Sequence, residues 1–149
     1  LGKRELPADA LYGIQTLRGV ENFSISRFKL EYYPAFINGL AYTKLAAAGE
    51  HQLGLLTDEQ YAGIKAACED IVAGKYHEIP VDMIQVAQAD TNMNANEVIA
   101  NRAAQLAGKP LGTYDYIHPN DNVNLDNPQM TYFQTAGKLT CLFLVDGLI

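Results

Sequence analysis

The chain has 149 residues, 48% of them hydrophobic and 19% charged, so it can bury a sizeable core and is not a generally disordered polymer. Its formal net charge of −6 argues against a general partner role with nucleic acid or an anionic membrane, because such partners select a basic surface. Two cysteines, Cys68 and Cys141, are too few for a disulfide framework and favour reduced, buried thiols in a cytoplasmic protein.

The first 26 residues consist of short apolar pieces separated by turn-forming residues. Gly2, Pro7, Gly13 and Gly19 provide these interruptions. This pattern predicts an extended arm with turns or a short hairpin instead of a long helix.

Two amphipathic helices are expected next. Pro34 is well suited to a helix start, and an apolar face continues as far as Gly49 through Ile37, Leu40, Ala41, Leu45 and Ala48. Thr57 and Gln60 form a capping-box pattern that opens the second helix. Its apolar face ends before Gly74 and comprises Tyr61, Ile64, Cys68 and Val72. The second helix looks purely structural.

A polar stretch over residues 90–103 turns directly into a third helix. Asp90 or Thr91 can cap its start, and Gly108 occupies the position where a left-handed C-terminal cap is expected. The apolar residues recur at helical spacing and are Val98, Ile99, Ala103 and Leu106.

Three asparagines, Asn92, Asn94 and Asn96, crowd the first turns of this expected helix. Their amides lie beside backbone N–H groups that have no partner within the helix, so together they could cradle a carboxylate. The alternative is that the same amides satisfy neighbouring loops and helix ends, as most buried polar side chains do.

Residues 108–123 are rich in proline and glycine and predict loops. Within them, His118-Pro119-Asn120-Asp121 is the one constellation with titrating chemistry, because a histidine changes charge near neutral pH and Asp121 could orient it. An ordinary, satisfied loop histidine is the competing interpretation.

A last helix is expected from about Thr131 to the end of the chain. Its apolar run over residues 139–149 is shorter than the ~20 residues of a membrane span and contains Asp146, so we expect no membrane partner. The run stops without a capping residue, and the chain begins without methionine, so we expect an incomplete chain.

The sequence predicts neither a metal ion nor a bound cofactor. His51, His77 and His118 are far apart, and none has a second histidine or a cysteine at ligand spacing. The Gly108-Lys109-Pro110 triplet lacks the remaining residues of a phosphate-binding loop, and no Gly-x-Gly-x-x-Gly is present.

Three segments together resemble a known family. Residues 91–103, Thr-Asn-Met-Asn-Ala-Asn-Glu-Val-Ile-Ala-Asn-Arg-Ala, resemble the first signature of the aspartase/fumarase superfamily, and residues 117–124 resemble the segment that follows it. The opening residues 4–18 also fit, and Tyr12-Gly13 with Glu21-Asn22-Phe23 is more like aspartate ammonia-lyase than like fumarase.

The resemblance implies a mainly α-helical fold. Residues 1–135 would form the N-terminal domain, with a short extended arm, and residues 136–149 would begin a helix of the central bundle that assembles a homotetramer.

The resemblance also implies a reaction, in which L-aspartate is deprotonated beside its β-carboxylate and loses ammonia to give fumarate. Thr91, Asn92 and Asn94 would belong to the substrate-binding region for this small dicarboxylate. A secondary anion site would consist of His118, Asn120 and Asp121. The serine base of the family lies far downstream and is absent from these residues, so no catalytic residue is assigned.

Two departures from the family fall on its carboxylate-binding loops. A Gly-Gly-Ala-Gly-Thr-Ser-like loop is replaced by residues 86–90, Val-Ala-Gln-Ala-Asp, and Ser-Thr-Asn is replaced by residues 128–130, Pro-Gln-Met. An inactive relative, a deliberately altered protein, or a sequence read incorrectly at both loops would explain this. Fumarate hydratase and a non-catalytic scaffold therefore stay open beside aspartate ammonia-lyase.

Overall fold

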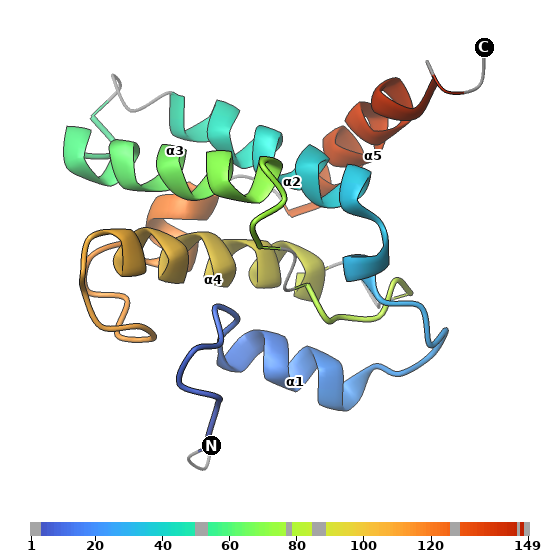
Figure 1. Cartoon of the computed structure of the whole chain (residues 1–149), viewed down its shortest axis with the longest axis horizontal. Coiled ribbons are helices and arrows are strands. Elements are labelled where there is room, and N and C mark those ends of the chain that lie inside the picture. The colour runs from blue at the N-terminus through green and yellow to red at the C-terminus, as the bar shows by residue number, and fades with distance from the viewer. Residues whose placement is uncertain are drawn as a thin grey trace.

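The structure is a computed structural model and describes residues 4–49, 54–76, 79–84, 89–125, 129–145 and 147. In these residues every regular element is helical, and the only bridge between extended segments joins Lys29 and Asp82. The elements are α1 (Ile14–Asn22), η1 (Leu30–Tyr32), α2 (Pro34–Ala48), α3 (Asp58–Val72), α4 (Ala89–Leu106), η3 (Pro119–Asn124) and α5 (Gln129–Val145). The expected mainly α-helical class is confirmed (Figure 1).

Local signals place α2 and α3 where the sequence predicts them. Pro34 is the first residue of α2. At the start of α3, the Thr57 hydroxyl accepts a hydrogen bond from the Gln60 N–H at 3.2 Å, while the Gln60 side chain accepts one from the Thr57 N–H at 3.1 Å, so the capping box is confirmed. Gly74 and Gly108 have φ values of 75° and 66°, the left-handed conformation expected beyond the ends of α3 and α4.

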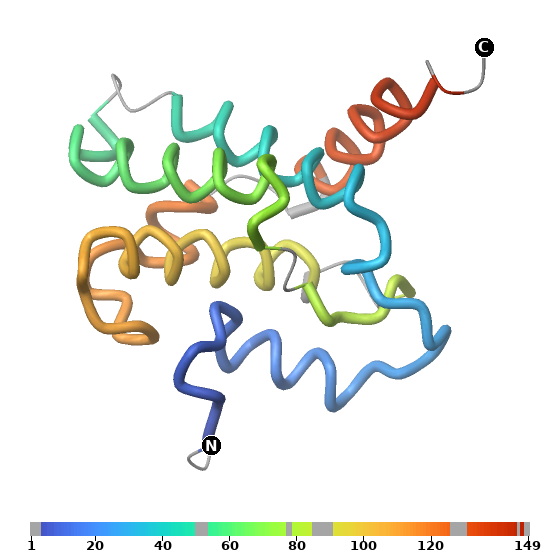
Figure 2. Tube along the Cα trace, viewed as in Figure 1, coloured from blue at the N-terminus to red at the C-terminus, as the bar shows by residue number. Residues whose placement is uncertain are grey.

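The core lies between α2, α3 and α4, with α1 packed along the opposite side of α4 (Figures 1 and 2). Its most completely buried apolar side chains include Ile37, Leu40, Ile64, Val98 and Ile99. Cys68 is buried there, as expected, but Cys141 is exposed on α5, so the expectation of two buried thiols is wrong for Cys141. Beyond Ala136 the described residues of this chain cover the apolar face of α5 only in part, as where the rings of Phe143 and Tyr42 lie with centroids 5.7 Å apart, and the Cys141 thiol stays exposed.

Two boundaries differ from the sequence-based expectations. The arm contains helix α1, where turns or a hairpin were expected, because the carboxylate of distant Glu97 caps the helix by accepting hydrogen bonds from the N–H groups of Gly13 and Thr16. Helix α4 begins at Ala89, so Asp90 and Thr91 lie inside its first turn and not at the position before it where a cap was expected.

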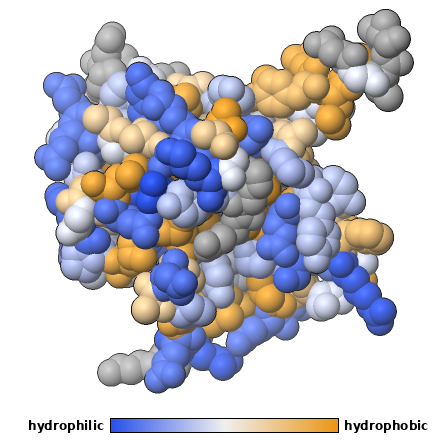
Figure 3. All heavy atoms as spheres, in the orientation of Figure 1, coloured by the Kyte–Doolittle hydropathy of each residue, from blue (hydrophilic) through white to orange (hydrophobic). Residues whose placement is uncertain are grey.

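Helix α5 leaves the body of the molecule at its C-terminal end and presents apolar side chains on the surface (Figures 1 and 3). The exposed side chains are Leu142, Phe143, Leu144 and Val145. In the described part of the chain, no helix combines the length and hydrophobicity that crossing a membrane requires.

The close approach of α2 to α5 yields a stability prediction. A Cβ at Gly39 would stand 2.6 Å from the carbonyl oxygen of Ala136, so Gly39→Ala forces the two helix backbones apart. Although alanine favours a helix, we expect a loss of about 1–3 kcal/mol in the free energy of unfolding from overpacking. Urea denaturation measures this change in the free energy of unfolding.

The matched control is Gly49→Ala at the end of the same helix. A Cβ at Gly49 would meet no atom within 4 Å, and its φ of −61° suits any residue, so the change should alter stability by less than about 1 kcal/mol. Equal stability of the two variants would contradict the predicted clash.

Candidate functional site

A lysine side chain stands at the meeting point of three helical elements. The Lys44 ammonium, on α2, donates hydrogen bonds to Oδ1 of Asn92 on α4 at 2.6 Å and to Oδ1 of Asn124 on η3 at 2.9 Å. The Asn92 amide donates to the same Asn124 oxygen at 3.0 Å. All three side chains are buried, and Lys44 is 0% exposed. The three polar groups therefore form a closed triangle in the interior.

An aromatic ring completes this arrangement from α5. The Lys44 ammonium lies 3.4 Å from the centroid of the Tyr132 ring, a distance at which the face of the ring attracts a cation. The Tyr132 hydroxyl donates a hydrogen bond to the backbone carbonyl of Asn124 at 3.0 Å. We call Lys44, Asn92, Asn124 and Tyr132 the Lys44 cluster.

Burial lowers the pKa of this lysine. Removal of the ammonium from water lowers the pKa of Lys44 from 10.5 to about 7, an effect that Cys68 partly opposes. Burial also raises the pKa of the Cys68 thiol to about 12, so this neighbour stays neutral through the physiological range. Lys44 consequently changes charge near neutral pH in a site lined by amide oxygens that favour its charged form.

The sequence analysis missed Lys44, although a signal was present. Lys44 continues the apolar stripe of α2 at helical spacing after Ile37, Leu40 and Ala41, and a lysine at such a position must bury its ammonium or leave the stripe. Its partners are 48 and 80 residues away in the chain, so their identity could not be read from the local pattern.

The expected substrate-binding residues lie together at the start of α4. Thr91, Asn92 and Asn94 are each at most 1% exposed. Asn92 joins the Lys44 cluster. The two loops that depart from the family, residues 86–90 and 126–131, lie mostly outside the described residues, and so do His51 and His77. A substrate-binding role for Thr91, Asn92 and Asn94 stays a prediction.

The residues of the expected secondary anion site occupy the other end of η3. Nδ1 of His118 lies 3.2 Å from the Asp121 carboxylate and accepts a hydrogen bond from the Asp121 N–H at 3.3 Å. The backbone N–H of His118 donates a hydrogen bond to the side-chain oxygen of Asn122 at 2.8 Å. Asn120 is exposed. The structure thus brings His118 and Asp121 together on an open surface, and anion binding there stays a prediction.

Among the described residues, no three or more histidine, cysteine, aspartate or glutamate side chains form a group that could hold a metal ion. The chemistry available at the Lys44 cluster is that of a buried cation and amide groups. Such groups orient neighbouring backbone and favour negative charge nearby.

Lys44 makes the stability of the fold depend on pH above neutrality. The unfolded lysine titrates near 10.5 and the buried one near 7, so between these values the unfolded state holds one more proton and the free energy of unfolding rises with pH. The slope approaches about 1.4 kcal/mol per pH unit. Urea denaturation between about pH 7 and pH 8.5 should show this rise in the wild type and lose it in Lys44→Met. Equal slopes in both proteins would refute it.

Three comparisons place the chain among known proteins. A family model described as lyase matches residues 2–148. Aspartate ammonia-lyase of Pseudomonas aeruginosa is 47% identical over 152 aligned residues, which cover 100% of this chain and 32% of that protein. Fumarate hydratase class II of Halobacterium salinarum is 42% identical and covers 95% of this chain and 30% of that protein.

A solved structure agrees with the sequence comparisons. The fumarate lyase:delta crystallin from Brucella melitensis has a TM-score of 0.91 and 47% sequence identity, covering 95% of this chain and 33% of that one. The chain thus spans about a third of the length of the relatives that it matches. It belongs to the lyase family, within the aspartase/fumarase superfamily, and it is close to aspartate ammonia-lyase.

Proposed function

We propose that the intact protein is a lyase that eliminates ammonia from L-aspartate to give fumarate. The observation that carries the proposal is the 3.0 Å hydrogen bond between the side chains of Asn92 and Asn124. Asn92 closely follows the segment that stands where the family has its first carboxylate-binding loop, and Asn124 closely precedes the segment that stands in place of the second. The described residues nearest to the two segments thus meet at one buried point, which supports a shared substrate site.

The proposed reaction demands stabilisation of negative charge. Deprotonation beside the β-carboxylate gives an intermediate with two negative charges on that group, and preorganised donors must be aimed at it. Thr91, Asn92 and Asn94 are proposed to support the loop that binds the substrate. The general base would be a serine from a later part of the intact protein, and His118, Asn120 and Asp121 would form a secondary anion site.

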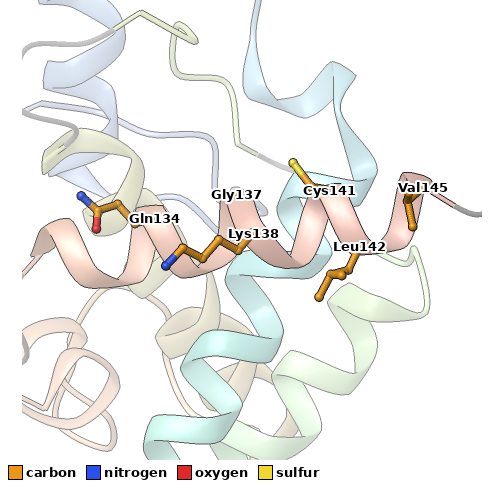
Figure 4. A pocket seen from close by; sticks show the side chains of 6 residues that line it. All are labelled: Gln134, Gly137, Lys138, Cys141, Leu142 and Val145. Carbon is orange, nitrogen blue, oxygen red and sulfur yellow. The ribbon is translucent and has the colours of Figure 1, made fainter.

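Assembly into a homotetramer is proposed to use the exposed face of α5, with residues 136–149 beginning a helix of a central bundle. A groove of about 680 Å³ runs along this helix (Figure 4). Its lining residues are Gln134, Gly137, Lys138, Cys141, Leu142 and Val145. An apolar helix face of this kind needs a partner to remove it from water. The free thiols of Cys68 and Cys141 support the proposed cytoplasmic location.

The test is an assay of the purified intact protein with L-aspartate, in which fumarate is followed by its ultraviolet absorbance and D-aspartate serves as the control. Fumarate from L-aspartate alone supports the proposal. Fumarate from L-malate instead would favour a hydratase, the activity named for the Halobacterium salinarum relative. Absence of both activities would overturn the proposal and favour a non-catalytic scaffold, which the two altered loops allow.

A further inference from the structure

A cluster of exposed apolar residues lies where two distant segments of the chain meet. Ile25 and Phe28 belong to the segment after α1, and Met83 and Ile84 belong to a segment that precedes α4. These residues are 57%, 58%, 39% and 54% exposed, and we call them the Phe28 patch. We propose that a second copy of the intact protein covers the Phe28 patch. The inference goes beyond the proposed reaction and the proposed α5 interface, because it concerns other residues.

Backbone hydrogen bonds hold the two segments side by side (Figure 2). The N–H of Met83 donates to the carbonyl of Phe28 at 2.8 Å. Two residues further along, the N–H of Leu30 donates to the carbonyl of Val81 at 3.1 Å. Leu30 and Val81 are 2% and 1% exposed. Alternate residues of paired extended segments share a face, so the apolar face that is buried at Leu30 and Val81 continues outward to Phe28 and Met83.

The Asp82 carboxylate fixes the backbone beside the two isoleucines of the patch. It accepts hydrogen bonds from the hydroxyl and the N–H of Ser26 at 2.7 and 2.8 Å, and from the N–H of Ile84 at 2.8 Å. Ile25 directly precedes Ser26 in the chain. The Phe28 patch is therefore built on fixed backbone, as a contact surface that changes little on binding requires.

The area of the Phe28 patch fits the apolar centre of an interface between two copies. A fully exposed side chain of this size offers on the order of 200 Å², so the four exposed fractions amount to roughly 400 Å². A standard interface buries about 800 Å² on each partner, and somewhat more than half of that area is apolar. Tyr32 in η1, which follows the first segment, is 60% exposed and adds a residue type that interfaces favour.

The charges beside the patch favour a second copy of this acidic chain. Lys29 is paired with Glu31 at 3.4 Å. Arg27 is exposed, and its guanidinium has no acidic partner in the part of the chain that the structure describes. An interface that covered Arg27 would have to supply a carboxylate. A second copy can do so, because the chain carries a formal net charge of −6.

The test is photo-cross-linking of the intact protein with p-benzoyl-phenylalanine in place of Phe28. This residue keeps an aromatic ring and, on irradiation, forms a covalent bond with a group that lies against it. Two copies with different tags are produced in the same cells, and only one of them carries the benzoyl group. We expect a cross-linked product that contains both tags.

The matched control places the same benzoyl residue at Leu55. Leu55 is 56% exposed and lies outside the Phe28 patch, just before α3. Irradiation of this variant should give no product with both tags. A product from both positions in equal yield would contradict a specific contact at the Phe28 patch.

A second measurement gives the size of the effect. Phe28→Glu should raise the dissociation constant of the subunits by about 30-fold, the cost of losing one buried anchor of an interface. Sedimentation velocity of the intact protein over a dilution series measures this constant, and Leu55→Glu should leave it unchanged. If Phe28→Glu does not fold, the cross-linking experiment, which keeps the aromatic ring, decides.

The remaining outcomes overturn the inference. A cross-linked product within one chain would mean that a later part of the same chain covers the Phe28 patch, and a product with a different protein would identify another partner. No product, a monomeric wild type, or a folded Phe28→Glu variant with unchanged dissociation would also overturn it. The fumarate assay of the same wild type tests the proposed reaction separately, so the two can fail independently.

Discussion

Replacement of Glu97 by glutamine should lower the free energy of unfolding by roughly 3 kcal/mol and loosen the N-terminal arm. The Glu97 carboxylate is 1% exposed and accepts hydrogen bonds from the N–H groups of Gly13, Gln15 and Thr16 at 2.9–3.0 Å, and from the Thr16 hydroxyl at 2.6 Å. The amide of glutamine keeps the shape but directs N–H groups at backbone N–H groups, which leaves buried donors unpaired.

The charge of Glu97 matters as well as its oxygen atoms. The backbone N–H groups that it accepts from form the N-terminus of α1, where the helix dipole favours a negative charge. No room remains for a rearrangement, because a Cβ on Gly13 would already stand 2.6 Å from the Glu97 carboxyl group. Loss of the carboxylate should therefore destabilise α1 before the rest of the fold.

Two measurements check this prediction. Urea denaturation gives the change in stability, and limited proteolysis of residues 4–22 reports release of the arm. Burial and the Glu97 charge together raise the pKa of Tyr114 to about 12, so the ultraviolet titration of this tyrosine should move to lower pH in Glu97→Gln.

Glu69→Gln is the control for Glu97→Gln. Glu69 is exposed on α3 and lies 3.9 Å from Lys65 in a surface ion pair, so its replacement should change stability by less than about 0.5 kcal/mol. A loss in Glu97→Gln no greater than in Glu69→Gln would show that the buried carboxylate does not anchor the arm.

The contrast between Glu97 and Thr57 explains how much of the fold the sequence predicts. Thr57 and its capping partner Gln60 are three residues apart, so the start of α3 follows from a local pattern. Glu97 lies more than 80 residues along the chain from the N–H groups of Gly13 and Thr16 that it caps, and no residue near Gly13 in the sequence indicates that cap. Helix α1 was consequently missed, while α2 and α3 were predicted with nearly correct bounds.

The candidate site divides in the same way. The asparagine-rich entry to α4 and the pairing of His118 with Asp121 follow from residues close in sequence, and the signature over residues 91–103 identifies the family. The Lys44 cluster depends on packing of α2 against η3 and α5, which the local sequence pattern of any one helix does not specify. The exposure of Cys141 has the same origin, because an apolar stripe does not reveal which of its residues the rest of the chain covers.

Restoration of the family-like residues at both loops should raise kcat/KM for L-aspartate by at least about 1,000-fold. Loss of a single donor to a developing oxyanion costs about 100- to 1,000-fold in rate, and several donors of the family are absent here. At the second loop the changes are Pro128→Ser, Gln129→Thr and Met130→Asn. A serine before α5 is also a favoured helix cap, so the fold should tolerate it.

The first loop requires replacement of residues 86–90 by the longer Gly-Gly-Ala-Gly-Thr-Ser segment. Either loop restored alone should give only part of the gain, because in the proposed reaction both loops act on one substrate, and Asn92 and Asn124 beside them are joined by Lys44. Steady-state assays of the intact wild type, each single-loop variant and the combined variant measure this coupling. An exposed double change on α3, Lys65→Ala with Glu69→Ala, controls for unspecific effects. If the unaltered protein already turns over L-aspartate within tenfold of the rate of the combined variant, these loops do not limit catalysis. Charge stabilisation would then have to come from residues of the intact protein outside this chain.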